Sequence, residues 1–444
     1  MSFQQLSDYI LLASCVFIIL GSLFITVKTR FVQLRHLKIL FKILKSSFLS
    51  KSSNSSSMIL PHRALFTAMS TTLGISTIVA PIIAINLGGP GALLGFLLTS
   101  FLGSAATFTE VSLCIQHRKK LSSGVVMGGP MQYIESLLSP FVAKWYAGCC
   151  LLLMITWSGA QSNQLAAILD SPLLGDYRIS TLFSGLFIAT FILIIFLGGI
   201  KRIGAFSAKL IPVMFTLYIG ASLLILFFNM EKLGSIFHDM FQSALSPVAM
   251  ASGTLVGGIA ATLRWGIFKG TQACEAGIGT QAIPHSMAET NDPETQGALA
   301  MLSTYTAGIL AFLSGCVTLV TKTWQNPELP LGINMVAASF EMYFSSFGVT
   351  IIIFCAFLFG LGTILGNNYN GGQCYAYLMN NKKNRYYIVG ATAMVFIGAV
   401  AEVRILWSFM DLILASMAVP HMAALLRHVF KKTTPAMIES KNSI

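Results

Sequence analysis

The sequence predicts an all-α polytopic membrane protein with about eleven transmembrane helices. Hydrophobic residues make up 55% of its 444 positions, charged residues only 10%, and the mean hydropathy is +0.75. Soluble domains carry roughly 25% charged residues. A membrane core about 30 Å thick needs roughly 20 apolar residues per helix, and runs of that kind recur from Tyr9 to Phe430. The chain is therefore expected to cross a membrane many times.

Breaks between the apolar runs define the expected spans. They lie near residues 9–27, 64–87, 91–116, 145–169, 180–199, 206–229, 250–285, 297–321, 346–380, 386–401 and 405–428. The first run has no basic residue before it and no small-residue cleavage site after it, so it is expected to be a retained helix rather than a signal peptide. The basic, amphipathic stretch 31–49 is expected to lie on the membrane surface, with a solvated linker as the alternative.

The distribution of positive charge predicts the orientation. If the N-terminus is outside, 22 of the 28 Lys and Arg residues fall in cytoplasmic segments, as the positive-inside rule requires. The C-terminus is then cytoplasmic, and the expected location is the cell inner membrane. The net charge of +12 is explained by this topology and by attraction to anionic membrane lipid, so no nucleic-acid partner is expected. The eight scattered cysteines are interpreted as packing residues.

Three spans interrupt their apolar pattern with glycines beside side-chain oxygens. The second has TTLGIST at 71–77, the seventh GTQACEAGIGTQ at 270–281, and the ninth GLGTILGNNYNGG at 360–372. Glycine permits an unwound turn, which exposes backbone groups that lipid cannot satisfy. Each feature also has a structural explanation. Glycine pairs such as Gly362/Gly366 serve close helix packing, and membrane hydroxyls commonly bond back to their own helix.

The second and seventh spans are expected to be broken helices, and they lie five helices apart. This spacing is typical of two inverted five-helix repeats, in which half-helix ends bind an anionic group and a cation near mid-membrane. The expected organisation is an N-terminal helix plus amphipathic segment (1–63), a first repeat (64–229), a second repeat (230–430) and a cytoplasmic tail (431–444). Secondary transport is the function that this device favours.

Ionisable side chains within spans are costly and therefore informative. Glu275 could balance a cation or act in a gate, with Arg264 or Lys269 as a partner, or it could form a structural ion pair. Glu110 and Asp411 are open between functional and structural roles.

No metal-ligand spacing, nucleophile elbow or Walker A motif is present, so neither an enzyme nor a cofactor is expected. The alternative from another class is a membrane-embedded enzyme using Glu110, Glu275 and His285, but it lacks a positioned nucleophile and base. A purely structural membrane protein is a third possibility.

The same segments resemble the alanine or glycine:cation symporter family. The match follows the chain through LGGPGALLGF, GGPMQYIE, EAGIGTQAIPHSMAETNDPETQGALAML and TILGNNYNGGQCYAYL. The resemblance implies a leucine-transporter-like fold with broken helices 2 and 7. It also implies a symporter that couples sodium influx to uptake of a small neutral amino acid, such as D- or L-alanine or glycine. A proton-coupled or exchange transporter, with Glu275 as the titrating group, is the alternative.

The resemblance implies site residues position by position. Substrate contacts are expected from Thr72, Gly74, Ser76, Thr77, Gln161, Cys274, Gly277, Thr363 and Asn367, and a sodium site from Gly74 and Thr363. An interhelical hydrogen bond is the alternative role for Gln161.

Four of these positions depart from the family pattern. Ser76 and Thr77 stand where the family has glycine and asparagine, Cys274 replaces an asparagine, and Asn367 replaces a tryptophan. These changes favour a larger or more polar substrate than alanine.

Overall fold

A computed structural model describes residues 3–49, 58–120, 126–197, 199–245, 258–380, 385–401 and 403–432, and these residues are almost entirely helical. The helices are α1 (Phe3–Lys28), α2 (Val32–Arg35), α3 (Leu37–Leu49), α4 (Pro61–Thr72), α5 (Ile75–Gly88), α6 (Ala92–His117), α7 (Pro130–Leu137), α8 (Pro140–Leu169), α9 (Thr181–Phe196), α10 (Gly199–Phe227), α11 (Met230–Leu245), α12 (Gly258–Cys274), α13 (Ala282–His285), α14 (Pro293–Thr321), α15 (Ile333–Phe344), α16 (Ser346–Leu378), α17 (Arg385–Val400) and α18 (Val403–Lys432). Two 3₁₀ turns, η1 (Pro172–Tyr177) and η3 (Thr323–Gln325), and one antiparallel pair, β1 (Lys119–Lys120) with β2 (Val126–Met127), complete the described elements.

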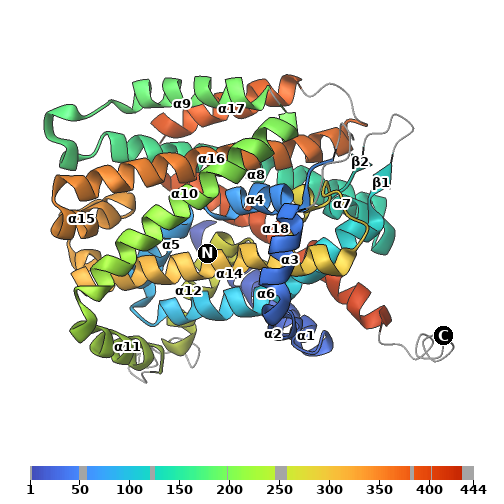
Figure 1. The fold of residues 1–444 in the computed structure, drawn as a ribbon, viewed down its shortest axis with the longest axis horizontal. Coiled ribbons are helices and arrows are strands. Elements are labelled where there is room, and N and C mark those ends of the chain that lie inside the picture. Colours follow the sequence, from blue (N-terminus) through green and yellow to red (C-terminus); the bar gives the residue numbers. More distant parts are fainter. Residues whose placement is uncertain are drawn as a thin grey trace.

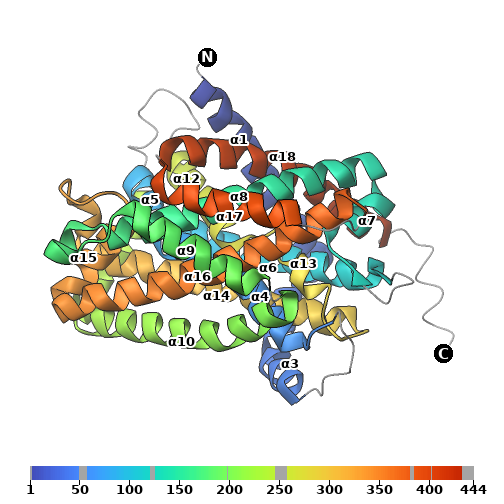
Figure 2. The same ribbon diagram turned by 90° about the horizontal axis from the view of Figure 1, so that it is seen from above.

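The long helices run roughly along one direction and form a single bundle (Figure 1). Helices α11 and α15 lie toward one end of the bundle, and α7 and the β1–β2 pair lie toward the other (Figure 1). Helix α3 projects from one side (Figure 2). Within the bundle α6 packs against α12 and α14, and α8 packs against α16 and α17. Segments far apart in the sequence therefore share one core.

Seven helices in the described part of the chain are long and apolar enough to cross a membrane. They are Pro61–Gly88, Ala92–His117, Pro140–Leu169, Arg202–Phe227, Pro293–Thr321, Ser346–Leu378 and Met410–Lys431. Three shorter apolar helices, Ala13–Lys28, Thr181–Phe196 and Tyr386–Val400, lie at positions where the sequence also predicts spans. The expected total of eleven stays a prediction, as do the two repeats, and most of the tail 431–444 lies outside the described residues.

Local sequence explains where several helices begin. Proline stands at the first position of α4, α7, α8 and α14, where its missing amide costs nothing. Asp292 caps α14 by accepting hydrogen bonds from the Glu294 and Thr295 amides at 3.1 and 3.2 Å. The amphipathic stretch is helical as expected, although a bend at His36 divides it into α2 and α3.

The glycine-rich segment of the ninth span does not unwind, because α16 continues without interruption from Ser346 to Leu378. Its glycines serve close packing instead. A Cβ on Gly366 would lie 2.5 Å from Thr71 Cγ2, and one on Gly371 would lie 2.3 Å from the Tyr387 hydroxyl. The unwound turn that these glycines would permit is therefore absent from α16, and the packing explanation holds there.

Candidate functional site

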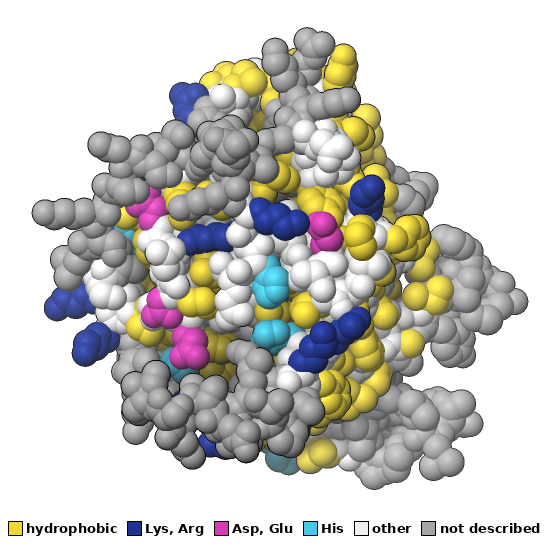
Figure 3. All heavy atoms as spheres, turned by 90° about the vertical axis from the view of Figure 1, so that its right-hand side faces the viewer, with side chains coloured by type: hydrophobic (Ala, Val, Ile, Leu, Met, Phe, Trp, Pro, Cys, Tyr) yellow, Lys and Arg dark blue, Asp and Glu magenta, His cyan; other side chains and the backbone are white. Residues whose placement is uncertain are grey.

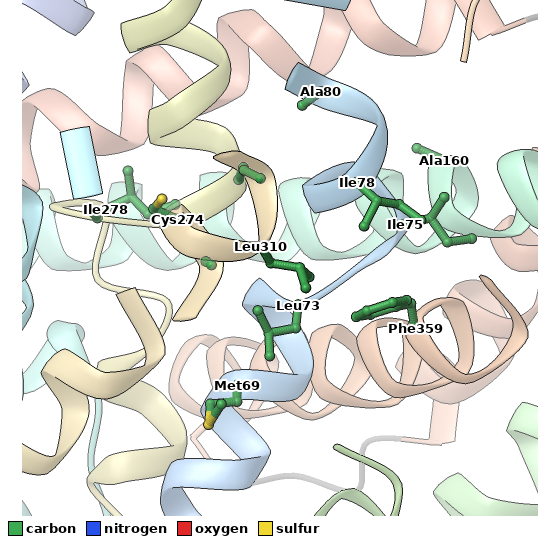
Figure 4. Close-up of a cluster of buried hydrophobic side chains, with 14 of the residues drawn as sticks. Met69, Leu73, Ile75, Ile78, Ala80, Ala160, Cys274, Ile278, Leu310 and Phe359 are labelled. Atoms are coloured by element: carbon green, nitrogen blue, oxygen red, sulfur yellow. The ribbon is translucent and has the colours of Figure 1, made fainter. Parts of the chain in front are cut away.

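The first interruption separates α4 from α5 at Leu73 and Gly74. Leu73 leaves the helical region, and Gly74 is extended with φ −98° and ψ −179° (Figure 4). Within Pro61–Gly88, 94% of the 18-residue apolar stretch is buried inside the protein, a larger share than in the other six candidate spans. The break therefore lies inside the protein, where its free backbone groups can find partners.

Gln161 of α8 supplies partners for the N-terminus of α5. Its side-chain carbonyl accepts a hydrogen bond from the Ile75 amide at 3.0 Å, and its Nε2 donates to Ser76 Oγ at 3.2 Å. The first amides of a helix carry partial positive charge and bind acceptors or anions. The interhelical hydrogen bond considered for Gln161 is thus present, and it lies at a half-helix end.

Thr363 of α16 approaches the break from the other side. Its hydroxyl donates to the Ser70 carbonyl at 2.9 Å. A Cβ added to Gly74 would lie 2.7 Å from Thr363 Oγ1 and 3.0 Å from Gln161 Nε2. Only glycine lets three chain segments come so close at this point.

Most hydroxyls of the TTLGIST segment satisfy the backbone around the break. Thr71 donates to the Ala68 carbonyl at 2.8 Å, and Thr72 donates to the Met69 carbonyl at 3.2 Å. Thr77 Oγ1 crosses the break and donates to the Thr72 carbonyl at 2.6 Å. The back-bonding explanation therefore holds for these three, whereas Ser76 is exposed.

The second interruption, residues 275–281, separates α12 from α13. Glu275, Gly277 and Gly279 all have positive φ, at 49°, 74° and 89°, and glycine is the residue that adopts this region without strain. The Glu275 carboxylate is 1% exposed and accepts hydrogen bonds from Thr280 Oγ1 and, at 3.3 Å, from Thr71 Oγ1. Glu275 thus connects the two broken helices.

A cavity lies between the first break, α8, α12, α16 and α18. It is lined by Thr71, Ser76, Val79, Ala80, Ile83, Trp157, Ala160, Gln161, Gln164, Lys269, Gln272, Glu275, Thr363, Met410 and Asp411. Nine of these fifteen residues are polar or charged, and polar groups that converge on a cavity beside apolar side chains are typical of a small-molecule site.

On one wall of this cavity the side-chain amide of Gln272 bridges the ammonium group of Lys269 and the carboxylate of Asp411. Lys269 Nζ donates to Gln272 Oε1 at 3.1 Å, and Gln272 Nε2 donates to Asp411 Oδ1 at 2.6 Å. Lys269 is only 5% exposed. Lys269 lines the same cavity as Glu275, whereas the side chain of Arg264, the other proposed partner, lies outside the described residues.

The structure brings together only some of the expected site residues. Ser76, Gln161, Thr363 and Glu275 line the cavity, and Gly74 lies between Gln161 and Thr363.

Five expected residues lie outside the cavity lining: Thr72, Thr77, Cys274, Gly277 and Asn367. Thr72 Oγ1 bonds to Ser303 Oγ of α14 at 2.9 Å. A Cβ on Gly277 would meet Met422 and Ile18, so this glycine faces α18 and α1. Asn367 is fully buried on α16.

Sequence reasoning did not assign Gln164, Gln272 or Trp157 to the cavity. Gln164 lies three residues after Gln161 on α8, so the two share a helix face, and that spacing is a signal that could have identified Gln164. Gln272 lies near the end of α12, three residues before Glu275 in the break.

Two interrupted helices that meet at a buried polar cavity define a class of protein, the secondary transporters. The sequence model of the sodium:alanine symporter family matches residues 2–438, and the chain belongs to this family. Its members are transporters, so the membrane-enzyme alternative is excluded. The chain is a multi-pass membrane protein.

Known relatives match over most of their length. The chain is 29% identical to the sodium/alanine symporter AgcS of Methanococcus maripaludis, covering 92% of this chain and 90% of the relative. It is also 29% identical to the probable sodium/glutamine symporter GlnT of Bacillus subtilis, and the match covers 91% of this chain and 82% of that relative.

Among solved structures, the fold matches a Na⁺-coupled sialic acid symporter with a TM-score of 0.54 at 15% identity, covering 84% of this chain and 80% of the other. The expectation of a leucine-transporter-like fold is thereby confirmed.

Proposed function

We propose that this protein couples sodium influx to the uptake of a small neutral amino acid such as alanine or glycine. The observation that carries the proposal is the convergence of the α5 N-terminus, Gln161 and Thr363 on Gly74. The family supports it, since a relative is named as a sodium/alanine symporter.

The substrate carboxylate is proposed to meet the amides at the start of α5, beside Ser76. Partial positive charge at a helix N-terminus stabilises an anion there. Gln161 fixes this end of the helix and can turn its amide toward either charge of a zwitterion. The substrate ammonium group is then directed toward Glu275, which lines the same cavity.

Sodium is proposed to bind between the Ser70 carbonyl and the Thr363 hydroxyl, beside Gly74. Both groups are neutral oxygens, which suit a hard cation. In the structure the hydroxyl donates to that carbonyl. Sodium would turn the hydroxyl so that both oxygens face the ion, and the ion would then favour one arrangement of α4 and α16.

A second candidate substrate is an amino acid with a side-chain amide, such as glutamine. The observation that favours it is the wall formed by Lys269, Gln272 and Asp411, where an amide already bridges an ammonium and a carboxylate. The amide of a substrate has the same donor and acceptor pattern. The relative named as a probable sodium/glutamine symporter supports this candidate.

Purified protein in proteoliposomes tests the proposal directly. Labelled alanine, glycine and glutamine are supplied with an inward sodium gradient or an equal potassium gradient, and we expect uptake only with sodium. Thr363→Ala should raise the half-saturating sodium concentration by about tenfold, because loss of one ligand costs about 1.4 kcal/mol. The matched control Thr363→Ser keeps the hydroxyl and should stay within about threefold of wild type. Sodium-independent uptake of all three substrates would refute the coupling.

The proposed location is the cell inner membrane, with the N-terminus outside and the C-terminus cytoplasmic. The cavity is lined by the half of the second span that follows the break, including Val79 and Ile83. In this orientation that half leads outward, so the cavity would face the outside. A membrane-impermeant thiol reagent should then label a cysteine at Ser76 from outside intact cells.

A further inference from the structure

A second group of polar side chains lies behind the second break, outside the lining of the cavity. Glu110 of α6, Tyr133 of α7, Tyr146 of α8 and His421 of α18 are each 0% exposed. Two of them hold carbonyl groups of the break. Tyr146 donates to the Ile278 carbonyl at 2.8 Å, and His421 Nδ1 lies 2.8 Å from the Gly277 carbonyl. Two helices, α8 and α18, thus hold the break from this side.

The Gly277 carbonyl determines which nitrogen of His421 can titrate. A carbonyl only accepts hydrogen bonds, so Nδ1 must carry a proton in order to donate to it. The other nitrogen, Nε2, is then the atom that gains or loses a proton. Nε2 is hydrogen-bonded to the Tyr133 hydroxyl and lies 3.8 Å from Glu110 Oε2.

Glu110 needs this imidazole, because its carboxyl oxygens have little compensation among the described residues: no hydrogen bond of standard geometry reaches them, and the Gly279 amide is their favourable backbone neighbour. An isolated buried carboxylate is very costly. One proton shared by Glu110 and His421 removes that cost, either as a neutral acid beside a neutral imidazole or as an ion pair. Loss of the proton leaves one uncompensated negative charge inside the protein.

The other titratable groups around the pair do not supply a positive charge. They are Cys114 on α6, Tyr133 on α7, Tyr146 on α8 and Glu275 in the break. Glu275 is negative when ionised and adds to the cost of an unprotonated Glu110. The backbone amide of Gly279 is the favourable neighbour of Glu110 within the break.

A partly exposed histidine connects this group with the surface. His117 ends α6, and its ring packs edge-on against Tyr133 with ring centres 6.5 Å apart. Histidine side chains also reach the surface at the end of the molecule that carries α7, β1 and β2 (Figure 3). His117, Tyr133 and His421 thus form a succession of polar side chains from that end to Glu110.

We propose that Glu110 and His421 form a proton-binding site whose occupancy is coupled to the shape of the second break, so that a proton is exchanged during the transport cycle. The proton stabilises the conformation in which the pair is buried and His421 holds Gly277. Opening of the break admits water, and the proton then passes from the pair to that water. The pair lies outside the cavity lining, although the charge of Glu275 acts on Glu110, and it does not require a particular amino acid as the transported substrate.

Infrared spectroscopy of the purified protein in lipid tests the proposal without any transported substrate. The carbonyl stretch of protonated carboxyl groups is followed as the pH is raised from about 5 to about 10. We expect the wild type to lose intensity in this band as the pH rises, and the difference between the wild type and Glu110→Gln to contain the part that belongs to Glu110. Glu135→Gln is the matched control, since Glu135 pairs with Lys119 at 3.5 Å near the surface.

A histidine variant separates protonation from structural support. In His421→Asn the amide nitrogen can take the place of Nδ1 and donate to Gly277, but no group replaces Nε2. Glu110 should then keep its proton to higher pH, by about one pH unit or more, while the melting temperature stays close to that of the wild type. His421→Ala removes both groups and should also lower the melting temperature.

Three results would overturn the proposal: no carboxyl band in the wild type, a band that does not change with pH, or a pH-dependent band of the same amplitude in the wild type and in Glu110→Gln. Proteoliposomes provide the transport readout. With equal sodium concentrations on both sides of the membrane, an inward proton gradient should stimulate uptake of labelled alanine in the wild type at least threefold more than in Glu110→Gln. If neither protein transports alanine, the proposed substrate fails, whereas the infrared titration still decides whether the proton site exists.

Discussion

Replacement of Gly74 by alanine tests whether close approach at the first break creates the proposed sodium site. Gly74 has φ −98° and ψ −179°, which any residue can adopt, so alanine brings no backbone strain. Its effect is purely steric, because the new Cβ would lie 2.7 Å from Thr363 Oγ1. Thr363 must retreat by about 0.7 Å to reach ordinary van der Waals contact.

That displacement has a calculable consequence. It stretches the 2.9 Å hydrogen bond from Thr363 to the Ser70 carbonyl beyond the usual range. Loss of the bond costs about 1 kcal/mol, and overpacking a buried contact costs about 1–3 kcal/mol more. Because both oxygens belong to the proposed sodium site, we expect at least about a tenfold rise in the sodium concentration needed for half-saturation.

The assay compares melting temperatures of the purified protein in increasing sodium and potassium chloride. A ligand that binds only the folded state raises the melting temperature according to its affinity. Gly220→Ala on α10 is the matched control, since nothing lies within 4 Å of a Cβ at that glycine. If Gly74→Ala required no more sodium than this control for the same stabilisation, the geometric argument for the site would be refuted.

Three further predictions concern packing, capping and the cavity wall. Gly266→Ala should destabilise the protein by about 1–3 kcal/mol in thermal unfolding, because the new Cβ would lie 2.0 Å from the Ala92 carbonyl oxygen. A Tm equal to that of Gly220→Ala would contradict this steric argument. Asp292→Ala should cost about 1 kcal/mol at pH 7 through loss of the α14 cap. Hydrogen bonds from Thr295 lower the pKa of the Asp292 carboxyl. The stabilisation should therefore be present above the unfolded pKa of about 3.9 and disappear as the pH falls through the lower pKa of the folded protein. A series of Tm measurements at different pH values would detect this loss. Lys269→Met should weaken uptake of labelled glutamine more than that of alanine, and equal losses for both would argue against an amide subsite.

The sequence was sufficient to predict the first break because glycine and several hydroxyls coincide there within an apolar run. The ninth span carries a similar signal, yet α16 is continuous. Glycine gives the backbone conformational freedom, and because it has no side chain it also allows close packing. Which of these two properties matters at a position depends on the chain segment packed against it. At Gly366 the neighbour is Thr71, and at Gly371 it is Tyr387. Neither contact can be inferred from spacing along one helix.

The cavity wall shows a second limit of sequence reasoning. Gln272 and Asp411 belong to different helices, and their hydrogen bond depends on how α12 and α18 rotate against each other. Gly277 illustrates the reverse case, since its position within the broken segment was predicted but the side toward which it faces was not. Helix identity and interruption are local properties of the sequence, whereas facing direction is set by packing.

The hydrogen bond from Thr77 to the Thr72 carbonyl has a mechanical consequence. An interrupted helix would ordinarily behave as a flexible joint, but here the two halves are tied directly across the bend. This bond adds about 1 kcal/mol to the cost of changing the angle between α4 and α5. A tilt of α4 that keeps the bond would carry the α5 N-terminus with it.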